Sequence, residues 1–449
     1  MKRLISNNPA MRWFILVLVG FVLSVNYYFY DAFSTLKDQL LLEFNFTNTH
    51  YGLFVSFYSI PNTFLLMAVI GGMILDKLGI RRTGFMFVFF MAFGAMLTAY
   101  GASKYYQDNG IGHSFMSSFL SAYSPELKMM LLGRFFFGLG AETSIVVVSK
   151  ILVKWFKGKD LALAFGLKVG FGRLGTFAAF QLSPVLSNDG VTLNLAIWVA
   201  AILVCIGLLA FMVYILLDMR IDKEIKPIET SESKPDFSFK DIGLILGNRA
   251  YLYIALLCVT FYSAVFPFLA YAPDFFADKF GFTAIQSGRI TSILPIATAI
   301  CTPLFGLMID RRGRSATAMI YGALTLLVVH LIFAFTNTSP YVPIVFLGIA
   351  FSLVPAAMWP TMVKLVDESK IGTAYGLMYS IQNLGLWGFP LLAGIILDKT
   401  NPGNPEVSNY QPVIIMFAAL GLLGLVFAFL LRREDRISGF GVEKPLNRT

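Results

Sequence analysis

The stretch GMILDKLGIRR at residues 72–82 recurs as GLMIDRRGR at residues 306–314. Each copy has a glycine, an aspartate four positions later, a basic residue directly after it, a second glycine and then arginine. Each copy also follows the second long apolar run of its half of the chain. The two copies therefore indicate an internal duplication, with the same loop at the same place in each half.

Long apolar runs fill the sequence around these two loops. Of 449 residues, 57% are hydrophobic and 14% are charged, whereas a soluble domain has about 25% charged residues. A membrane-spanning helix needs about 20 mostly apolar residues. Twelve such runs lie near 13–36, 52–76, 83–101, 127–149, 161–186, 192–217, 250–277, 287–309, 316–336, 340–363, 372–397 and 411–431. The sequence predicts an all-α membrane protein in which 12 transmembrane helices form two six-helix bundles in parallel pseudo-repeat.

The longest charged segment, residues 218–249, separates the sixth run from the seventh. It predicts an N-terminal bundle over 1–217, a cytoplasmic linker over 218–249, and a C-terminal bundle with a short cytoplasmic tail over 250–449. Runs five and eleven support the repeat, because Gly166 and Gly376, and Gly175 and Gly385, are each offset by 210. Parallel repeats of this kind place a binding site near the membrane midplane, between the halves.

The distribution of basic residues predicts the orientation. If both termini and every even-to-odd loop share one side, that side carries 26 of the 35 lysines and arginines and the other side carries five. Lys and Arg accumulate on the cytoplasmic side, so both termini are expected there. The net charge of +9 then needs no nucleic acid. A multi-pass protein of the bacterial cytoplasmic membrane is predicted, with the lysosomal membrane as the alternative.

Several kinds of chemistry lack the residues they require. The three cysteines lie in apolar runs, the chain has three histidines, and no CxxC or Cys/His cluster occurs, so no metal site and no cofactor are expected. No GxxxxGK[ST] loop is present, which leaves ATP-driven pumping unsupported. The predicted class is a non-enzymatic, monomeric carrier, with a small-molecule substrate, the lipid bilayer and, in some versions, protons as its partners.

Two opposite charges lie inside neighbouring apolar runs. Glu142 is twelve residues before Lys154, and Arg173 is fourteen residues after Lys159. At about 1.5 Å per residue, both lie roughly 20 Å from the loop that joins their helices. Charged residues at such depth are costly and therefore functional candidates. They form either a permanent buried ion pair or two poles for a zwitterionic or charged solute, and Glu142 can also relay protons.

Other candidates surround this pair. Arg134 either bonds to the first span or contacts substrate, Lys168 either snorkels to the interface or binds substrate, and Asp31 is an outer gate, a proton site or a wetted helix end. Polar and aromatic candidates for the cavity wall are Tyr28, Tyr58, Tyr262, Tyr379, Gln382 and Asn383. The gating and latch set comprises Asp76, Arg81, Arg82, Asp310, Arg311 and Arg314 in the duplicated loops, together with Arg134 and Asp31.

The duplicated loop resembles the signature of the major facilitator superfamily, and the resemblance covers essentially the whole chain. Three stretches are similar to a branch of animal lysosomal dipeptide uniporters: 26–31 (NYYFYD), 133–142 (GRFFFGLGAE), and 153–159 (VKWFKGK) continuing to Arg173-Leu174-Gly175. The resemblance implies that Glu142 receives the N-terminal amine of a dipeptide and Arg173 its C-terminal carboxylate. Lys168 departs from that branch, in which a neutral residue stands.

The leading hypothesis is therefore a secondary transporter that moves dipeptides by alternating access, as a uniporter or linked to protons. The alternative is a proton-coupled symporter of a small organic carboxylate, in which Arg173 and Lys168 bind the anion and Glu142 carries the proton. A sensor or scaffold without transport is a third hypothesis.

Overall fold

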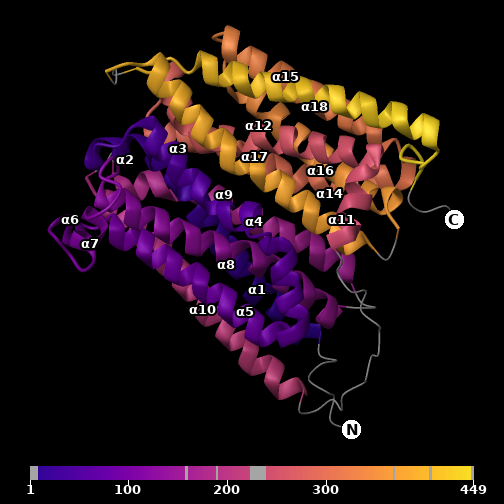
Figure 1. Ribbon diagram of the computed structural model, residues 1–449, viewed down its shortest axis with the longest axis horizontal. Helices are drawn as coiled ribbons and strands as arrows, with labels where there is room; N and C mark the ends of the chain where they lie inside the picture. The colour runs from indigo at the N-terminus through magenta and orange to yellow at the C-terminus, as the bar shows by residue number, and fades with distance from the viewer. Residues whose placement is uncertain are drawn as a thin grey trace. The chain divides into compact units, whose positions relative to one another are not determined.

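The computed structural model describes residues 9–156, 160–188, 191–222, 239–367, 370–403 and 407–445, and its regular elements within these ranges are helices (Figure 1). The chain packs into two compact units. The first unit comprises Met1–Ala32, Met67–Ala179 and Asn194–Asp236, and the second comprises Phe33–Leu66, Phe180–Leu193 and Phe237–Thr449. Two short segments of the predicted N-terminal bundle thus pack with the second unit.

The first unit is built on α1 (Pro9–Ala32), α5 (Met67–Gly101), α6 (Lys104–Gln107), α7 (His113–Ser117), α8 (Pro125–Phe156), most of α9 (Leu161–Ser187) and α10 (Leu193–Asp222). The second unit begins with η2 (Phe33–Leu36), α2 (Lys37–Phe44), α3 (Asn48–Ser56), η3 (Phe57–Ser59) and α4 (Ile60–Phe64). It continues with α11 (Phe239–Gly247), α12 (Arg249–Phe280), α13 (Ala284–Thr291), α14 (Ile293–Arg312), α15 (Ser315–Phe335), α16 (Tyr341–Leu365), α17 (Ile371–Thr400) and α18 (Gln411–Ser438).

Each of the twelve predicted runs falls on helix. Among the described residues, ten helices are long and apolar enough to cross a membrane, and the all-α prediction is confirmed. The run at 52–76 is not one helix, however. Pro61 lies in the first turn of α4, and Leu66 takes a left-handed conformation (φ 51°) between α4 and α5. The predicted linker 218–249 is also partly helical, because α10 extends to Asp222 and α11 occupies Phe239–Gly247.

The second glycine of each duplicated loop turns the chain. Gly79 lies within α5 at φ 77° and ψ 172°, where two helices meet at a kink, and Gly313 follows α14 at φ 68° and ψ −136°. Residues that carry a side chain rarely adopt a positive φ, whereas glycine does so at no steric cost. The equivalent conformations explain why the motif has glycine three residues after the aspartate in both copies.

Equivalent glycines also bring helices together in each unit. A Cβ on Gly175 of α9 would lie 2.0 Å from the Ser24 carbonyl oxygen of α1, and a Cβ on Gly385 of α17 would lie 2.0 Å from the Ser263 hydroxyl of α12. The repeated glycine therefore marks the same close contact in both halves. Within the second unit, α15 and α18 run side by side (Figure 1).

The chain beyond α18 forms a C-terminal strap, residues Gly439–Pro445, over the loop between α14 and α15. The Glu443 carboxylate accepts hydrogen bonds from the backbone N–H (3.1 Å) and hydroxyl (2.7 Å) of Thr317, and lies 3.1 Å from Arg432. Lys364 of α16 donates to the Gly441 carbonyl (3.0 Å) and the Lys444 carbonyl (2.6 Å). The strap therefore joins α15, α16 and α18 at the second duplicated loop.

Replacing Glu443 by alanine is expected to lower the stability of the second unit by about 1–2 kcal/mol. The substitution removes an acceptor and a negative charge from the N-terminus of α15, where both stabilise a helix. The thermal unfolding midpoint of the detergent-solubilised protein measures the effect. Glu434→Ala is the matched control, because Glu434 makes one exposed contact, with Ser438 (2.9 Å). Equal midpoints for the two variants would contradict a bracing role for the strap.

Candidate substrate site

Arg173 lies beside Tyr27 of α1 in the first unit, and the charge of Glu142 also acts on the phenol of Tyr27. Glu142 lies on α8 and Arg173 on α9, and both are partly buried. Gly172, next to Arg173, lets the ring of Tyr27 lie against α9, since a Cβ there would stand 2.9 Å from the ring. The Arg173 guanidinium is 5.9 Å from the centre of that ring. The close packing of α9 on α1 thus positions Arg173 beside Tyr27.

Glu142 and Arg173 both interact electrostatically with α1. The charges of Arg173, Glu142 and Asp31 all act on the phenol of Tyr27. The phenol of Tyr30, one turn further along α1, lies within reach of Asp31, Arg134 and Glu142. One face of α1 therefore meets both an acid of α8 and a guanidinium of α9. This arrangement can hold a molecule that carries both signs of charge.

Arg134 and Asp31 border the same face of α1. Arg134 is 1% exposed, donates to the Tyr30 carbonyl (3.4 Å) and lies 5.5 Å from the centre of the Tyr30 ring. These contacts agree with the first of the two interpretations of Arg134, in which it bonds to the first span. Asp31 is 4% exposed and lies near Thr176, Arg173 and Arg134. It is therefore buried in the first unit and is not a wetted helix end.

Lys168 reaches α8 from α9. Its Nζ donates to the Ser149 hydroxyl (2.5 Å) and to the Ile145 carbonyl (3.3 Å). These bonds satisfy two of its three donors. In this structure Lys168 joins two helices of the first unit, which is a structural use that does not require a substrate.

The first duplicated loop is held by ion pairs to α8 and α10. Asp76 lies 2.5 Å from Lys150, and Arg81 donates to the carboxylate (2.7 Å) and carbonyl (3.2 Å) of Asp218. Lys154 lies 2.7 Å from the other carboxylate oxygen of Asp218. Asp218, whose side chain is 2% exposed, thus binds two cations, Arg81 and Lys154. Arg82 is exposed.

The second duplicated loop has different surroundings. Asp310, Arg311 and Arg314 are exposed, and the backbone N–H of Arg314 donates to the Glu443 carbonyl of the strap (2.9 Å). The repeat in sequence is therefore not a repeat in contacts, because the strap has no counterpart in the described part of the first unit.

Two aromatic candidates of the second unit, Tyr262 on α12 and Tyr379 on α17, both contact Trp359 of α16. Trp359 donates to the Tyr262 hydroxyl (3.0 Å) and stacks on Tyr379 at 4.6 Å. Tyr379 is 37% exposed. The Asn383 side chain donates to the Tyr379 carbonyl (3.0 Å). Exposed aromatic surface beside a buried amide suits contact with a substrate side chain.

Three further candidates are buried. Gln382 accepts a long hydrogen bond from Cys258 (3.8 Å) in the second unit. Tyr58, in η3, is 7% exposed, and Tyr28, on α1 of the first unit, is 3% exposed. The candidates thus divide between the units. The first holds Glu142, Arg173, Lys168, Tyr28, Arg134 and Asp31, and the second holds Tyr58, Tyr262, Tyr379, Gln382 and Asn383.

Sequence reasoning did not single out Asp218, Lys37 or Asp274, each of which the structure places in an ion pair. Asp218 directly follows the sixth apolar run, and its signal was its place next to a basic loop. Lys37 and Asp274 form a buried ion pair in the second unit. Asp274 lies in the stretch YAPDFF of the seventh apolar run, so the rule that singled out Glu142 applies to it equally. Among the described residues, no group of three or more His, Cys, Asp or Glu side chains is placed to hold a metal ion.

The helical spans and the charges buried within them define a multi-pass membrane transporter. A model of the Major Facilitator Superfamily matches residues 13–390 and 290–446, and the chain belongs to this superfamily. It is 32% identical over 441 residues to the lysosomal dipeptide transporter MFSD1 of Mus musculus, covering 95% of this chain and 88% of the relative. The corresponding protein of Homo sapiens is 31% identical over 438 residues, covering 95% and 87%.

Solved structures agree on the fold. A bacterial homolog of the human lysosomal transporter Spinster, in an inward-facing and unoccupied conformation, matches with a TM-score of 0.69 and 14% identity, covering 95% of this chain and 98% of that chain. The predicted major facilitator fold is confirmed. The chain is a secondary transporter and not an enzyme.

Proposed function

We propose that the protein transports dipeptides by alternating access, with Glu142 and Arg173 as the two poles of the site. The observation that carries the proposal is that an acid on α8 and a guanidinium on α9 both act on Tyr27 of α1. The curated relatives in mouse and human are named as dipeptide transporters, which supports the same substrate class.

The chemistry of each pole matches one end of a dipeptide. A guanidinium holds a carboxylate through two parallel N–H donors, which fixes the direction of the carboxylate as well as its position. A glutamate accepts hydrogen bonds from an ammonium group. A ligand that carries both ends satisfies both partly buried charges at once. A ligand that lacks one end cannot bind to one of the two poles and loses the binding energy of that contact.

A ligand series tests the proposal. Purified protein in proteoliposomes is tested for uptake of a radiolabelled dipeptide in competition with the unlabelled dipeptide, its N-acetyl form, its C-terminal amide and a dicarboxylate. We expect the unmodified dipeptide to compete with the label. The affinity of each blocked form should be at least about tenfold lower, since one charge-assisted hydrogen bond contributes about 1.5–3 kcal/mol.

Two outcomes would contradict it. If the N-acetyl form competes as well as the free dipeptide, Glu142 does not bind an amine, and the carboxylate symporter becomes the better description. If no dipeptide competes or is taken up, the substrate class is wrong. Repeating uptake with a proton ionophore separates the two modes, because a uniporter is unaffected and a proton-linked carrier loses accumulation.

A further inference from the structure

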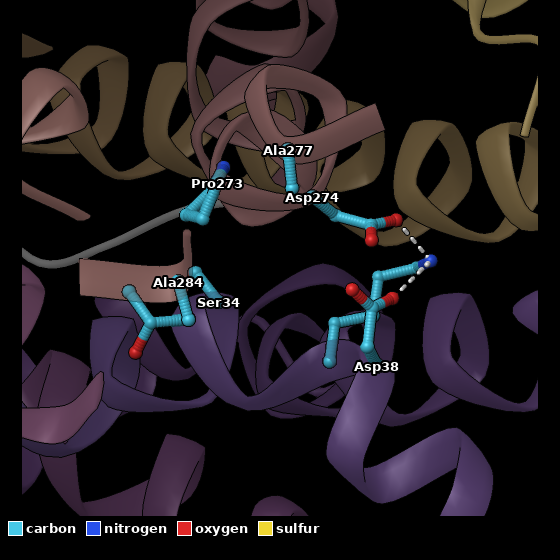
Figure 2. A pocket seen from close by; sticks show the side chains of 8 residues that line it. Ser34, Asp38, Pro273, Asp274, Ala277 and Ala284 are labelled. Carbon is cyan, nitrogen blue, oxygen red and sulfur yellow. Dashed lines mark hydrogen bonds and ion pairs between the residues drawn. The ribbon is translucent and has the colours of Figure 1, made fainter. Parts of the chain in front are cut away.

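The second unit contains a buried ion pair that includes none of the charged residues of the candidate substrate site. Lys37 opens α2 and Asp274 lies near the end of α12, 237 positions later. Each side chain is 3% exposed. The pair ties the segment Phe33–Leu66 to α12, and Figure 2 shows the amine between two carboxylates that approach from opposite sides.

The two carboxylates differ in their surroundings. Asp274 also accepts a hydrogen bond from the Tyr410 hydroxyl, and the rings of Tyr51, Tyr271 and Tyr410 stand 6.0, 5.9 and 5.8 Å from the Lys37 amine. Asp38 lies 3.8 Å from the same amine, but its side chain is 56% exposed. Lys37 therefore has one buried partner on α12 and one solvent-exposed partner on its own helix.

A small cavity adjoins the pair. Its volume is about 60 Å³, and its lining includes Ser34, Asp38, Asp274 and Ala284. The labelled side chains of Figure 2 surround this space. A site needs only about 10–15 Å³ to hold one water molecule. The cavity therefore has room for water beside the buried carboxylate, and water can deliver a proton to it.

We propose that Lys37 and Asp274 form a proton-operated lock that fastens Phe33–Leu66 to α12 and opens when Asp274 takes up a proton. When the segment Phe33–Leu66 moves away from α12, Lys37 moves with it. Asp38, its neighbour in sequence, then remains as its partner. Asp274 then loses the ammonium and keeps only the neutral Tyr410 hydroxyl as its bonded partner on this side of the lock. Breaking a buried pair in this way is strongly unfavourable, because a charge is left uncompensated. A proton on Asp274 removes that charge.

The direction of the pH effect follows from proton counting. The locked state holds Asp274 as a carboxylate paired with Lys37, and the open state holds it as a neutral acid, so the open state binds one more proton. A ligand that binds one state preferentially shifts the equilibrium toward that state. Acidification therefore favours opening. The lock does not depend on which solute is carried, so its failure and the failure of the dipeptide proposal are separate results.

Several other titratable groups surround the pair. Among the described residues they are Asp38 on α2, Tyr51 on α3, Tyr271 and Asp278 on α12, Asp398 on α17 and Tyr410 before α18. Asp278 accepts a hydrogen bond from the Ser408 backbone N–H (3.0 Å), and Asp398 accepts two from the start of α3, at 2.9 and 2.8 Å. Asp274 is the one of these acids that Lys37 contacts across the lock.

Cysteine labelling tests the lock without any substrate. Cys205, Cys258 and Cys301 are first replaced by serine or alanine. Ser34→Cys then reports the cavity beside the pair, since Ser34 is 5% exposed, and Leu42→Cys on the same segment is the reference, since Leu42 is 84% exposed. The rate of reaction with a maleimide is measured between about pH 5 and pH 8, and the ratio of the two rates removes most of the effect of thiol ionisation.

We expect the ratio to rise several-fold on acidification when Lys37 and Asp274 are intact. Asp274→Asn mimics the neutral acid and keeps a partner for Tyr410, so its ratio should be high at every pH. Lys37→Gln removes the other partner and should also raise the ratio, whereas Lys37→Arg should keep the pH dependence. A ratio that does not change with pH, or that stays low in Asp274→Asn and Lys37→Gln proteins with wild-type elution on size exclusion, would overturn the lock.

Discussion

Replacing Arg173 by glutamine is expected to reduce the affinity for a dipeptide roughly 30-fold or more. Removing one member of a desolvated charge pair costs about 2–5 kcal/mol, and about 1.4 kcal/mol corresponds to a factor of ten. Arg173→Lys should recover only part of the loss, because an ammonium cannot make two parallel bonds to a carboxylate. Competition for uptake in proteoliposomes measures the effect, with Arg220→Gln as the control at an exposed arginine of the same unit.

The ligand series distinguishes a substrate role from a structural one. In Glu142→Gln protein, the free and N-acetyl dipeptides should compete about equally, because the group that recognises the amine is gone. A permanent ion pair would behave differently. Each single variant would lose stability, and the double variant Glu142→Gln with Arg173→Gln would regain it, since no unpaired charge remains. Recovery of uptake in the double variant would contradict the two-pole site.

Replacing Gly175 by alanine is expected to destabilise the first unit by about 1–3 kcal/mol or more and to reduce transport. The added Cβ would meet the Ser24 carbonyl oxygen at 2.0 Å, and a backbone atom cannot rotate away. Overpacking of this kind typically costs about 1–3 kcal/mol. The shift of α9 away from α1 would also displace Arg173 from Tyr27. The thermal unfolding midpoint and the uptake rate measure the two effects.

Gly170→Ala is the matched control on the same helix. Nothing lies within 4 Å of a Cβ at this position, and alanine favours a helix over glycine by up to about 1 kcal/mol. The control should therefore be as stable as the unsubstituted protein or more so. Gly385→Ala should cost less than Gly175→Ala, because the Ser263 hydroxyl that it meets can rotate. Equal unfolding midpoints and uptake rates for the Gly170→Ala and Gly175→Ala variants would show that the packing of α9 on α1 does not depend on this contact.

The pattern of the sequence was sufficient for the fold, and the reason is physical. A span in lipid must satisfy its own backbone hydrogen bonds, so an apolar run of sufficient length becomes a helix. Composition, run length and the two loops with a glycine three residues after aspartate therefore predicted an all-α membrane protein with a repeated half. The break at Leu66 was not predictable in this way, because it interrupts a run whose composition remains apolar.

The substrate site was predictable in part. The cost of an intramembrane charge singled out Glu142 and Arg173, and counting residues from their shared loop placed them at similar depth. The approach of Arg173 to Tyr27 depends on Gly172 and Gly175, whose role appears only when α9 is packed on α1. The sequence left Lys168 open between an interfacial lysine and a ligand, and in the structure it donates to Ser149 and Ile145 of α8.

The sequence by itself determined which segments are helices, which half repeats which, and which charges lie in apolar surroundings, because these properties depend on neighbours along the chain. Only the tertiary structure decided the partners of those charges. Lys37 and Asp274 are 237 positions apart, and Arg81 and Asp218 are 137 apart. An ion pair acts over a few ångströms in space and leaves no periodic trace in sequence, so helix packing has to be known before such a pair can be assigned.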